Sequence, residues 1–316
     1  MAENPYDVMI VGTGPAGITA AIFAQRLGLR SVVLGDIPGG NLYMIESLKN
    51  FPGFPGGVPG TQFGAMGFQQ AAQEGAEFPM ARLDRLTHAE GRFQGVDANG
   101  QRYRASAAIA ATGRTPKRLP VPRVSMKGIH FCSICDGPLF RGRRATLAVV
   151  GSDNAAAQHA VSLSRIADQV LLVCRSNRLK TDASHQRLIA AQPNIRVMTG
   201  HEVTGFEGLD AVEALVLKVT GGEQHAVRVD GVFLAIGWTP NTGLFDLSVD
   251  RTSEGYLKTD ARLMTSFPGL FAAGDVRDTD MWQVVTACAD GARAAKFAAE
   301  FLGAHSPPLN CSAEKE

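Results

Sequence analysis

Hydrophobic and polar positions change period at once in this chain, from a strand pattern to a helix pattern. An apolar run, Asp7 to Val11, ends in the glycine-rich turn GTGPAG. A helical pattern from about Pro15 to Leu27 follows, and then a second apolar strand, Ser31 to Leu34. Strand, glycine turn, helix and strand in this order predict a β-α-β unit with parallel strands.

The next segments alternate between punctuated loop and strand patterns. Residues 38 to 60 hold so many glycines and prolines that we expect an extended loop without regular structure, and loops of that length are usually functional. Alternation from Phe78 to Ala108 predicts a β-meander that ends in the strand and turn AAIAATG, Ala107 to Gly113. The proline-rich RTPKRLPVP then indicates a linker.

The opening pattern then occurs a second time. A strand at Thr146 to Val150, a helix from about Asn154 to Ile166 and a strand at Val170 to Cys174 form another β-α-β opening, and VFLAIG, Val232 to Gly237, repeats AAIAATG. A last strand and turn, LFAAGDV at Leu270 to Val276, precede a helix from about Gln283 to Leu302. The repetition predicts an α/β protein with a duplicated nucleotide-binding fold.

Composition narrows the class of protein. With 316 residues, 45% of them hydrophobic and 19% charged, the chain reads as a globular protein large enough for two domains. The net charge of +1 gives no reason to expect nucleic acid as a partner. The N-terminus lacks the pattern of a signal peptide and no apolar run reaches bilayer length, so we expect no membrane partner and a cytoplasmic location.

The glycine turn is typical of dinucleotide binding. Gly12, Gly14 and Gly17 stand at G-x-G-x-x-G spacing between a strand and a helix, where backbone N–H groups can approach a pyrophosphate. Asp36 is the nearest acidic candidate for the adenosine ribose. Asp275, after Gly274, is expected either to hold a polyol hydroxyl or to act as an ordinary helix cap.

The sequence C-S-I-C-D-G carries the second candidate chemistry. Cys132 and Cys135 are the only two of the five cysteines at a redox spacing, and Asp136 beside them is placed to protonate a departing thiolate. Zinc is the main alternative for a C-x-x-C pair, but the sequence offers no second ligand pair, so we expect no metal. We expect Cys174 and Cys288 to be inert core thiols and Cys311 to be an exposed thiol in a polar tail.

The motifs GTGPAG, GGNL, KNFPG, ATG, CSICDG, AIGWTPNT and FAAGDV, in this order, resemble the low-molecular-weight thioredoxin reductase family from about Tyr6 to Leu302. C-x-x-C-D-G between two dinucleotide folds is that family's signature, and related flavin-dependent ferredoxin-NADP reductases lack the dithiol. The resemblance implies two Rossmann-like, three-layer ββα domains, the second inserted in the first. We expect a discontinuous FAD-binding domain at 1–116 and 244–316 and a dithiol domain at 117–243.

The resemblance also implies roles for individual residues. Cys135 would receive electrons from FAD, Cys132 would attack the disulfide of thioredoxin, and Asp136 would serve as acid and base. A homodimer is implied as well. The FAD contacts we expect are Gly12, Gly14, Pro15, Ala16, Gly17, Asp36, Gly40, Asn41, Leu42, Asn50, Ala111, Thr112, Gly113, Gly274, Asp275, Trp282, Gln283 and Val284.

The central domain departs from the family pattern where NADPH would bind. The expected G-x-G-x-x-A reads Gly151, Asp153, Ala156, and the expected basic HRR-x-x-x-R cluster is reduced to Cys174-Arg175-Ser176 with Lys180. A carboxylate at the second glycine position would repel a pyrophosphate, or it simply caps the helix. An Arg-Gln-Ala tripeptide of the family has become Trp282-Gln283-Val284, whose indole either covers the flavin or fills the core.

We therefore expect a disulfide reductase that does not use NADPH, and the chain resembles the branch of the family in which reduced ferredoxin is the electron donor. Eight Lys and Arg residues between Gly113 and Leu147 (Arg114, Lys117, Arg118, Arg123, Lys127, Arg141, Arg143 and Arg144) either attract acidic proteins or form a basic linker. Three alternatives stay open: an NADPH-dependent thioredoxin reductase with a divergent site, a flavin-dependent dithiol oxidase that uses oxygen, and a non-enzymatic redox sensor.

Overall fold

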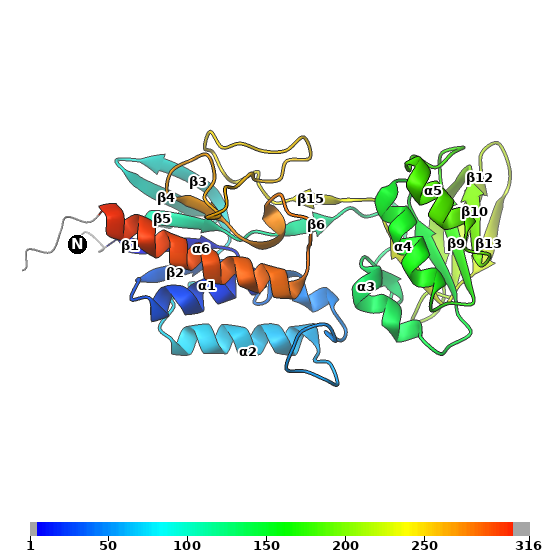
Figure 1. The fold of residues 1–316 in the computed structure, drawn as a ribbon, viewed down its shortest axis with the longest axis horizontal. Helices are drawn as coiled ribbons and strands as arrows, with labels where there is room; N and C mark the ends of the chain where they lie inside the picture. Colours follow the sequence, from blue (N-terminus) through cyan, green and yellow to red (C-terminus); the bar gives the residue numbers. More distant parts are fainter. Residues whose placement is uncertain (1–4, 306–316) are drawn as a thin grey trace, which may run out of the picture. The chain divides into compact units, whose positions relative to one another are not determined.

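The computed structural model describes residues 5–305, which form a mixed α/β protein of two compact units (Figure 1). One unit combines residues 5–115 with 239–305, and the other consists of residues 116–238. Each contains a parallel sheet with helices on one face and further strands on the other. The prediction of an α/β fold with two Rossmann-like parts is confirmed. Cys311, which we expected to be an exposed thiol, falls outside the described residues.

The discontinuous unit is built on a six-stranded sheet in the order β2-β1-β5-β4-β3, with β16 also paired to β5. Its elements are β1 (Tyr6–Val11), α1 (Pro15–Arg26), β2 (Ser31–Leu34), the 3-10 helix η1 (Gly40–Met44), α2 (Gly60–Gln73), β3 (Leu83–Ala89), β4 (Arg92–Asp97), β5 (Arg102–Ala110), β16 (Leu270–Ala272), the 3-10 helix η3 (Gly274–Val276) and α6 (Val284–His305).

Strand β5 joins the two halves of this sheet. Its beginning pairs antiparallel with β4 in the meander, and its end pairs parallel with β1 and β16. Side chains alternate along β1, so that Val8 and Ile10 pack under α1 and α6 while Met9 and Val11 pack against the meander side. Both faces of the central strands are therefore buried, as their continuous apolar sequence predicts.

The second unit repeats this plan. Its elements are β7 (Ile129–His130), α3 (Ser133–Asp136), the 3-10 helix η2 (Gly137–Phe140), β8 (Thr146–Val150), α4 (Asn154–Ser164), β9 (Gln169–Cys174), α5 (Ala183–Ala190), β10 (Ile195–Thr199), β11 (His201–Glu207), β12 (Ala214–Val219), β13 (Gln224–Arg228) and β14 (Gly231–Leu234).

Strands β10-β9-β8-β14-β7 form its parallel sheet, and β11-β12-β13 form an antiparallel sheet. Leu147 and Val149 of β8 face the alanine-rich side of α4, whereas Ala148 and Val150 face the layer that contains β11 and β12. Two short strands, β6 (Arg114–Pro116) and β15 (Trp238–Pro240), pair with each other where the chain passes between the units.

The expectation of an irregular loop over residues 38–60 is wrong in part. Gly39 and Gly40 take positive φ values of 88° and 52°, and this tight turn starts η1 within the stretch. Leu48 and Val58 form an isolated antiparallel bridge that closes the rest of the loop. Helix α2 begins at the last residue of the stretch, and the glycine-rich sequence did not predict it.

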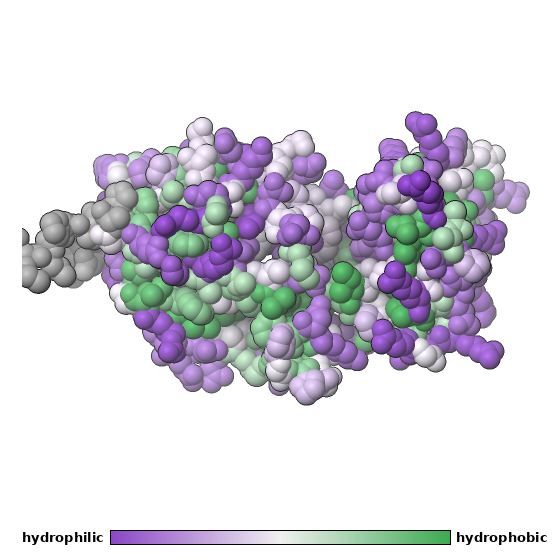
Figure 2. Space-filling model, viewed as in Figure 1, coloured by the Kyte–Doolittle hydropathy of each residue, from purple (hydrophilic) through white to green (hydrophobic). Residues whose placement is uncertain are grey.

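Hydrophilic residues occupy much of the face drawn in Figure 2, with apolar patches among them. None of the helices within residues 5–305 combines the length and the apolar character needed to cross a bilayer.

Candidate active site

The first glycine turn, between β1 and α1, is formed by close backbone contacts. A Cβ at Gly12, whose φ is 123°, would lie 2.1 Å from the carbonyl oxygen of Ala111, and a Cβ at Gly17 would lie 1.9 Å from that of Gly12. These two glycines let β1, β5 and α1 meet. Any side chain at either position would displace main chain.

Gly14 in the same turn has a different surrounding. An added Cβ there would meet only the carbonyl oxygen of Gly39, at 4.0 Å, so the position faces open space. Gly14 is the N-cap of α1, no side chain caps the helix, and its first turn contains no acidic residue. Uncapped N–H groups at the positive end of a helix dipole suit an anion, and this turn fits the pyrophosphate of FAD.

The second turn, between β8 and α4, has the same shape with a different chemistry. A Cβ at Gly151 would lie 2.3 Å from the carbonyl oxygen of Ala235, as Gly12 approaches Ala111. Asp153 occupies the N-cap position of α4, and its Oδ1 accepts the N–H of Ala156 at 3.1 Å. The carboxylate thus fills the place that stays open at Gly14, and the capping role weighed from the sequence is present.

A second carboxylate, which the sequence did not single out, lies beside this turn. The side chain of Asn154 and the backbone and carboxylate of Asp182 exchange two hydrogen bonds, of 3.0 and 3.1 Å. Asp182 accepts from Ser184 and His185, and these hydrogen bonds hold its pKa far below the usual value. Asp182 therefore adds a fixed negative charge near the N-terminus of α4.

Three basic residues, Arg175, Arg178 and Lys180, lie in the loop after β9 and are exposed to solvent. Arg175 lies 3.7 Å from Glu202 in an exposed ion pair, so within the described residues it is the one of the three with an acidic neighbour at this distance. Arg178 and Lys180 line a hollow of about 820 Å³ between the loop after β9, α5 and β10. The backbone N–H of Lys180 donates to the carbonyl of Ser152 at 2.6 Å and ties this loop to the turn that holds Asp153.

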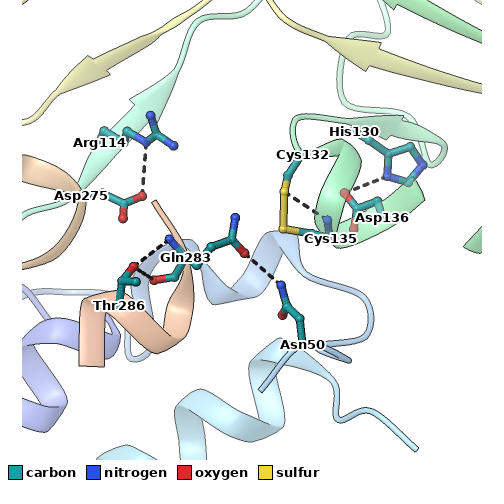
Figure 3. The surroundings of a disulfide bond; sticks show 9 residues. All are labelled: Asn50, Arg114, His130, Cys132, Cys135, Asp136, Asp275, Gln283 and Thr286. Carbon is teal, nitrogen blue, oxygen red and sulfur yellow. Dashed lines mark hydrogen bonds and ion pairs between the residues drawn. A yellow bond between two sulfur atoms is a disulfide. The ribbon is translucent and has the colours of Figure 1, made fainter. Parts of the chain in front are cut away.

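The dithiol lies at the start of α3, in the inserted unit. Cys132 and Cys135 form a disulfide (Figure 3), and Cys132 is the N-cap residue, whose sulfur accepts the N–H of Cys135 at 3.2 Å. A sulfur in this place is close to the positive end of the short helix, which favours its thiolate after reduction. Ile134 between the two cysteines is 61% exposed, so the motif presents an apolar residue to solvent.

Asp136 ends α3 as a buried carboxylate with one close partner. Its Oδ2 lies 3.2 Å from Nδ1 of His130 on strand β7, as Figure 3 shows, and both side chains are almost covered. The sequence identified Asp136 but not His130. The two meet because β7 pairs with β14 at the edge of the sheet, a contact that no local pattern predicts.

The discontinuous unit brings Asp275 to Arg114, its partner in an ion pair. Nε of Arg114 lies 3.2 Å from the carboxylate, and its guanidinium stacks 4.5 Å from the ring of Trp282. Burial raises the pKa of the Asp275 carboxyl, an effect that Arg114 opposes. Arg114 is one of the eight basic residues counted between Gly113 and Leu147, but its side chain is only 13% exposed, so it contributes little to a charged surface.

Other predicted cofactor residues of this unit meet across long stretches of chain. Asn50 donates to the side chain of Gln283 at 2.9 Å, 233 residues away, and Asn41 donates to the carbonyl of Arg114 at 2.7 Å. The hydroxyl of Thr112 donates to the carbonyl of Asn241 at 2.7 Å. Asp36, the candidate for the ribose, is exposed just beyond β2.

The remaining described cysteines have no redox neighbour. Cys174 is buried at the end of β9 beside Ser176. Burial raises the pKa of the Cys288 thiol on α6. Neither cysteine has a second thiol beside it among the described residues, which is consistent with inert core thiols.

Comparison with known proteins agrees with this geometry. The family model described as pyridine nucleotide-disulphide oxidoreductase matches residues 6–291. The thioredoxin reductase of Treponema pallidum (strain Nichols) is 34% identical over 305 residues, 95% of this chain and 98% of that protein. The NADPH-dependent thioredoxin reductase 3 of Arabidopsis thaliana is 36% identical over 310 residues, 94% of this chain and 58% of that protein. A solved thioredoxin reductase from Streptococcus pyogenes MGAS5005 superposes with a TM-score of 0.89 at 29% identity, covering 95% of this chain and 98% of that one.

Fold and dithiol together define a flavoprotein oxidoreductase that acts on disulfides. Within that class, the chain belongs to the low-molecular-weight thioredoxin reductase family.

Proposed function

We propose that this protein passes electrons from reduced FAD to the Cys132–Cys135 disulfide and then to thioredoxin, and that NADPH is not its electron donor. A reduced acidic electron carrier of the ferredoxin type supplies the electrons instead. The two parts rest on different features. The dithiol and the family support thioredoxin as the acceptor, and the second dinucleotide turn argues against NADPH as the donor. Resemblance to the ferredoxin-dependent branch of the family supports ferredoxin in its place.

The contrast between the two turns is the observation that carries the proposal. Gly14 leaves the N-terminus of α1 open and uncapped, whereas Asp153 caps α4 with a carboxylate and Asp182 adds a second negative charge beside it. A pyrophosphate at α4 would face anionic oxygens where the helix dipole would otherwise attract it. The strand, turn and helix still serve to hold α3, which packs on α4.

FAD, when bound, supplies a two-electron couple that can be filled one electron at a time. Gly12, Gly14 and Gly17 are proposed to admit its pyrophosphate to the N-terminus of α1. Asp275, held by Arg114, and the hydrogen-bonded Asn50 and Gln283 are proposed as its further polar contacts. The other residues assigned to this role from the resemblance remain part of the proposal.

Cys135 receives the electron pair, which breaks the sulfur–sulfur bond and leaves two thiol groups after two protons are taken up. The Cys132 thiolate then attacks the acceptor disulfide, forms a mixed disulfide and expels one acceptor thiolate, which takes a proton from Asp136. Attack of Cys135 on the sulfur of Cys132 restores the pair and releases the second acceptor thiolate. Exposed Ile134 gives the acceptor an apolar contact beside the reacting sulfur.

Two rival functions make different predictions. An NADPH-dependent enzyme, as the Arabidopsis relative is named, must bind NADPH despite Asp153. A dithiol oxidase must consume oxygen with a small dithiol. His130 places an imidazole beside Asp136, where it can serve as a base, and this observation keeps the oxidase as the second candidate.

A trapping experiment tests the acceptor. The Cys135→Ser variant, reduced and mixed with oxidised thioredoxin, should accumulate a disulfide between Cys132 and thioredoxin that mass mapping detects. The Cys132→Ser variant is the matched control and should trap far less. No adduct with either variant would contradict thioredoxin as the acceptor and would favour an oxidase or a redox sensor.

A homodimer and a cytoplasmic location complete the proposal, both carried over from the family resemblance. Light scattering of the purified full chain tests the first, and fractionation of source cells tests the second.

A further inference from the structure

His130 is held in one place by aromatic rings as well as by Asp136. Its imidazole stacks on Phe233 with a centroid distance of 4.9 Å, and it meets Phe140 edge to face at 5.7 Å. Phe233 is fully buried on β14, the strand that pairs with β7. A polar ring clamped between two aromatic residues, with one nitrogen 3.2 Å from a carboxylate, cannot rotate to another partner without breaking this packing.

The proposed reaction gives such a pair something to do. Asp136 is assigned to protonate a departing thiolate, and its carboxyl group must be resupplied with a proton in every turnover. Histidine is the side chain that most often gives and takes protons in enzymes. Nδ1 of His130, 3.2 Å from Oδ2 of Asp136, is placed to supply that proton.

We propose that His130 is the positioning residue that supplies Asp136 with the proton for the departing thiolate. This inference rests on the proposed disulfide reductase function and assigns its proton source. The imidazolium hydrogen-bonds Asp136, and the proton passes through the carboxyl group to the first acceptor thiolate, leaving a neutral imidazole. When Cys135 displaces the mixed disulfide, its own thiol proton returns to the pair. The second acceptor thiolate takes up a proton from solvent, which replaces the one that Cys132 released when it formed its thiolate. The balance is one dithiol and one disulfide exchanged for one disulfide and one dithiol.

Few other ionisable groups compete for this proton. Among the elements that pack against α3 and β7, neither η2 nor β14 carries an ionisable side chain, and α4 contributes His159. Burial lowers the pKa of His159, an effect that Asp153 opposes, so this imidazole favours its neutral form. Arg141, Arg143 and Arg144 follow η2 but are exposed to solvent. His130 is therefore the candidate that touches Asp136.

Two small disulfides used as acceptors can distinguish an effect on proton supply from an effect on the reactivity of the Cys132 thiolate. Oxidised glutathione releases an ordinary thiolate, whose departure is helped by a proton, whereas dipyridyl disulfide releases a resonance-stabilised pyridinethiolate anion, which needs no proton to depart. The experiment uses full-length holoprotein, reduced by one equivalent of dithionite without oxygen. Single-turnover rates with thioredoxin, glutathione disulfide and dipyridyl disulfide are then measured from acidic to alkaline pH.

The variant His130→Gln keeps a hydrogen-bond donor for Asp136 but removes the titrating ring. We expect it to slow exchange with thioredoxin and glutathione disulfide by about ten- to a hundredfold near neutral pH. The upper figure is the lower end of the usual contribution of general acid catalysis. The variant should also remove one inflection from the pH profile and leave dipyridyl disulfide unaffected. Asp136→Asn should lose a similar factor, and the double variant no more than either single one.

His225→Gln is the matched control, because His225 is exposed on β13 of the same unit. An unchanged pH profile in His130→Gln, or equal slowing with all three disulfides, would overturn the inference. Glutathione disulfide also separates the two levels of the argument. Wild-type protein that reduces it but not thioredoxin would contradict the proposed acceptor, while the effect of His130→Gln on glutathione exchange would still decide the role of His130.

Discussion

Replacing Asp153 by glycine changes the second dinucleotide turn into a copy of the first. The variant restores the open position seen at Gly14 and removes a carboxylate that now accepts the N–H of Ala156. Glycine is itself an acceptable N-cap, so the folded protein should lose only a few tenths of a kcal/mol. We expect the variant to fold and to bind NADP⁺ more tightly than the wild-type protein.

The magnitude follows from the exposure of Asp153. Two unit charges about 4 Å apart repel by about 1 kcal/mol when water separates them and by about 4 kcal/mol at a protein surface with an effective dielectric near 20. Because Asp153 is exposed, the gain in affinity should lie between these limits, from about fivefold to about a thousandfold. Salt should reduce it, because an exposed charge is screened.

Calorimetric titration of the oxidised holoprotein with NADP⁺ measures this affinity without a redox reaction. Asp153→Asn keeps a capping side chain and removes only the charge, so it should regain the electrostatic part of the effect. Asp168→Asn removes an exposed carboxylate from beyond the other end of α4 and should change nothing. Equal affinity of wild type and Asp153→Gly, whether tight or absent, would refute the argument that Asp153 closes this turn.

Three further predictions follow from other parts of the structure. Gly14→Asp, the reverse exchange, should fold because its Cβ meets open space, but it should lose FAD affinity by a factor within the same limits. FAD absorbance of the purified protein measures this loss against Gly243→Asp, an exposed control with open space at its Cβ. Full FAD content in Gly14→Asp would contradict this cofactor site. Alkylation of the reduced protein at neutral pH should label Cys132 and Cys135 but spare Cys288, because burial raises the pKa of the Cys288 thiol and its thiolate forms only at higher pH. Mass mapping identifies the labelled cysteines. Early labelling of Cys288 would contradict the prediction, since it would show that this thiol is accessible and reactive. Charge reversal of the exposed Arg141, Arg143 and Arg144 should slow flavin reduction by ferredoxin at least tenfold at low salt and much less at high salt. Charge reversal of the exposed Arg26 and Arg30 is the control. Equal rates of the two variants at low salt would show that the three arginines do not contribute to ferredoxin docking.

Local patterns were enough to predict the repeated β-α-β units. The predicted bounds of β2 and β8 match the observed ones. Both strands are continuous apolar runs followed by glycine, because each is buried on both faces, and such runs have clear ends in the sequence. Helix α2 escaped prediction, since glycines interrupt its sequence and its stability depends on packing against α1 and η1. Tertiary contacts here outweigh intrinsic propensity.

The candidate site residues also divide into those that local sequence predicts and those that only tertiary contacts bring together. The dithiol and the glycine turn are contiguous motifs, and their local geometry follows from a few neighbouring residues. His130 approaches Asp136 through strand pairing at a sheet edge, and Arg114 reaches Asp275 across 161 residues of sequence. Only the folded chain places these ionisable partners together, so the sequence could identify each carboxylate but not its partner.

Anaerobic mixing of the wild-type holoprotein with excess NADPH, followed by flavin absorbance, decides whether NADPH is the electron donor. We expect the oxidised flavin band to persist with NADPH and to bleach when reduced ferredoxin is added, with thiols appearing on thioredoxin in the same mixture. Prompt bleaching by NADPH alone, followed by thioredoxin reduction, would contradict this expectation.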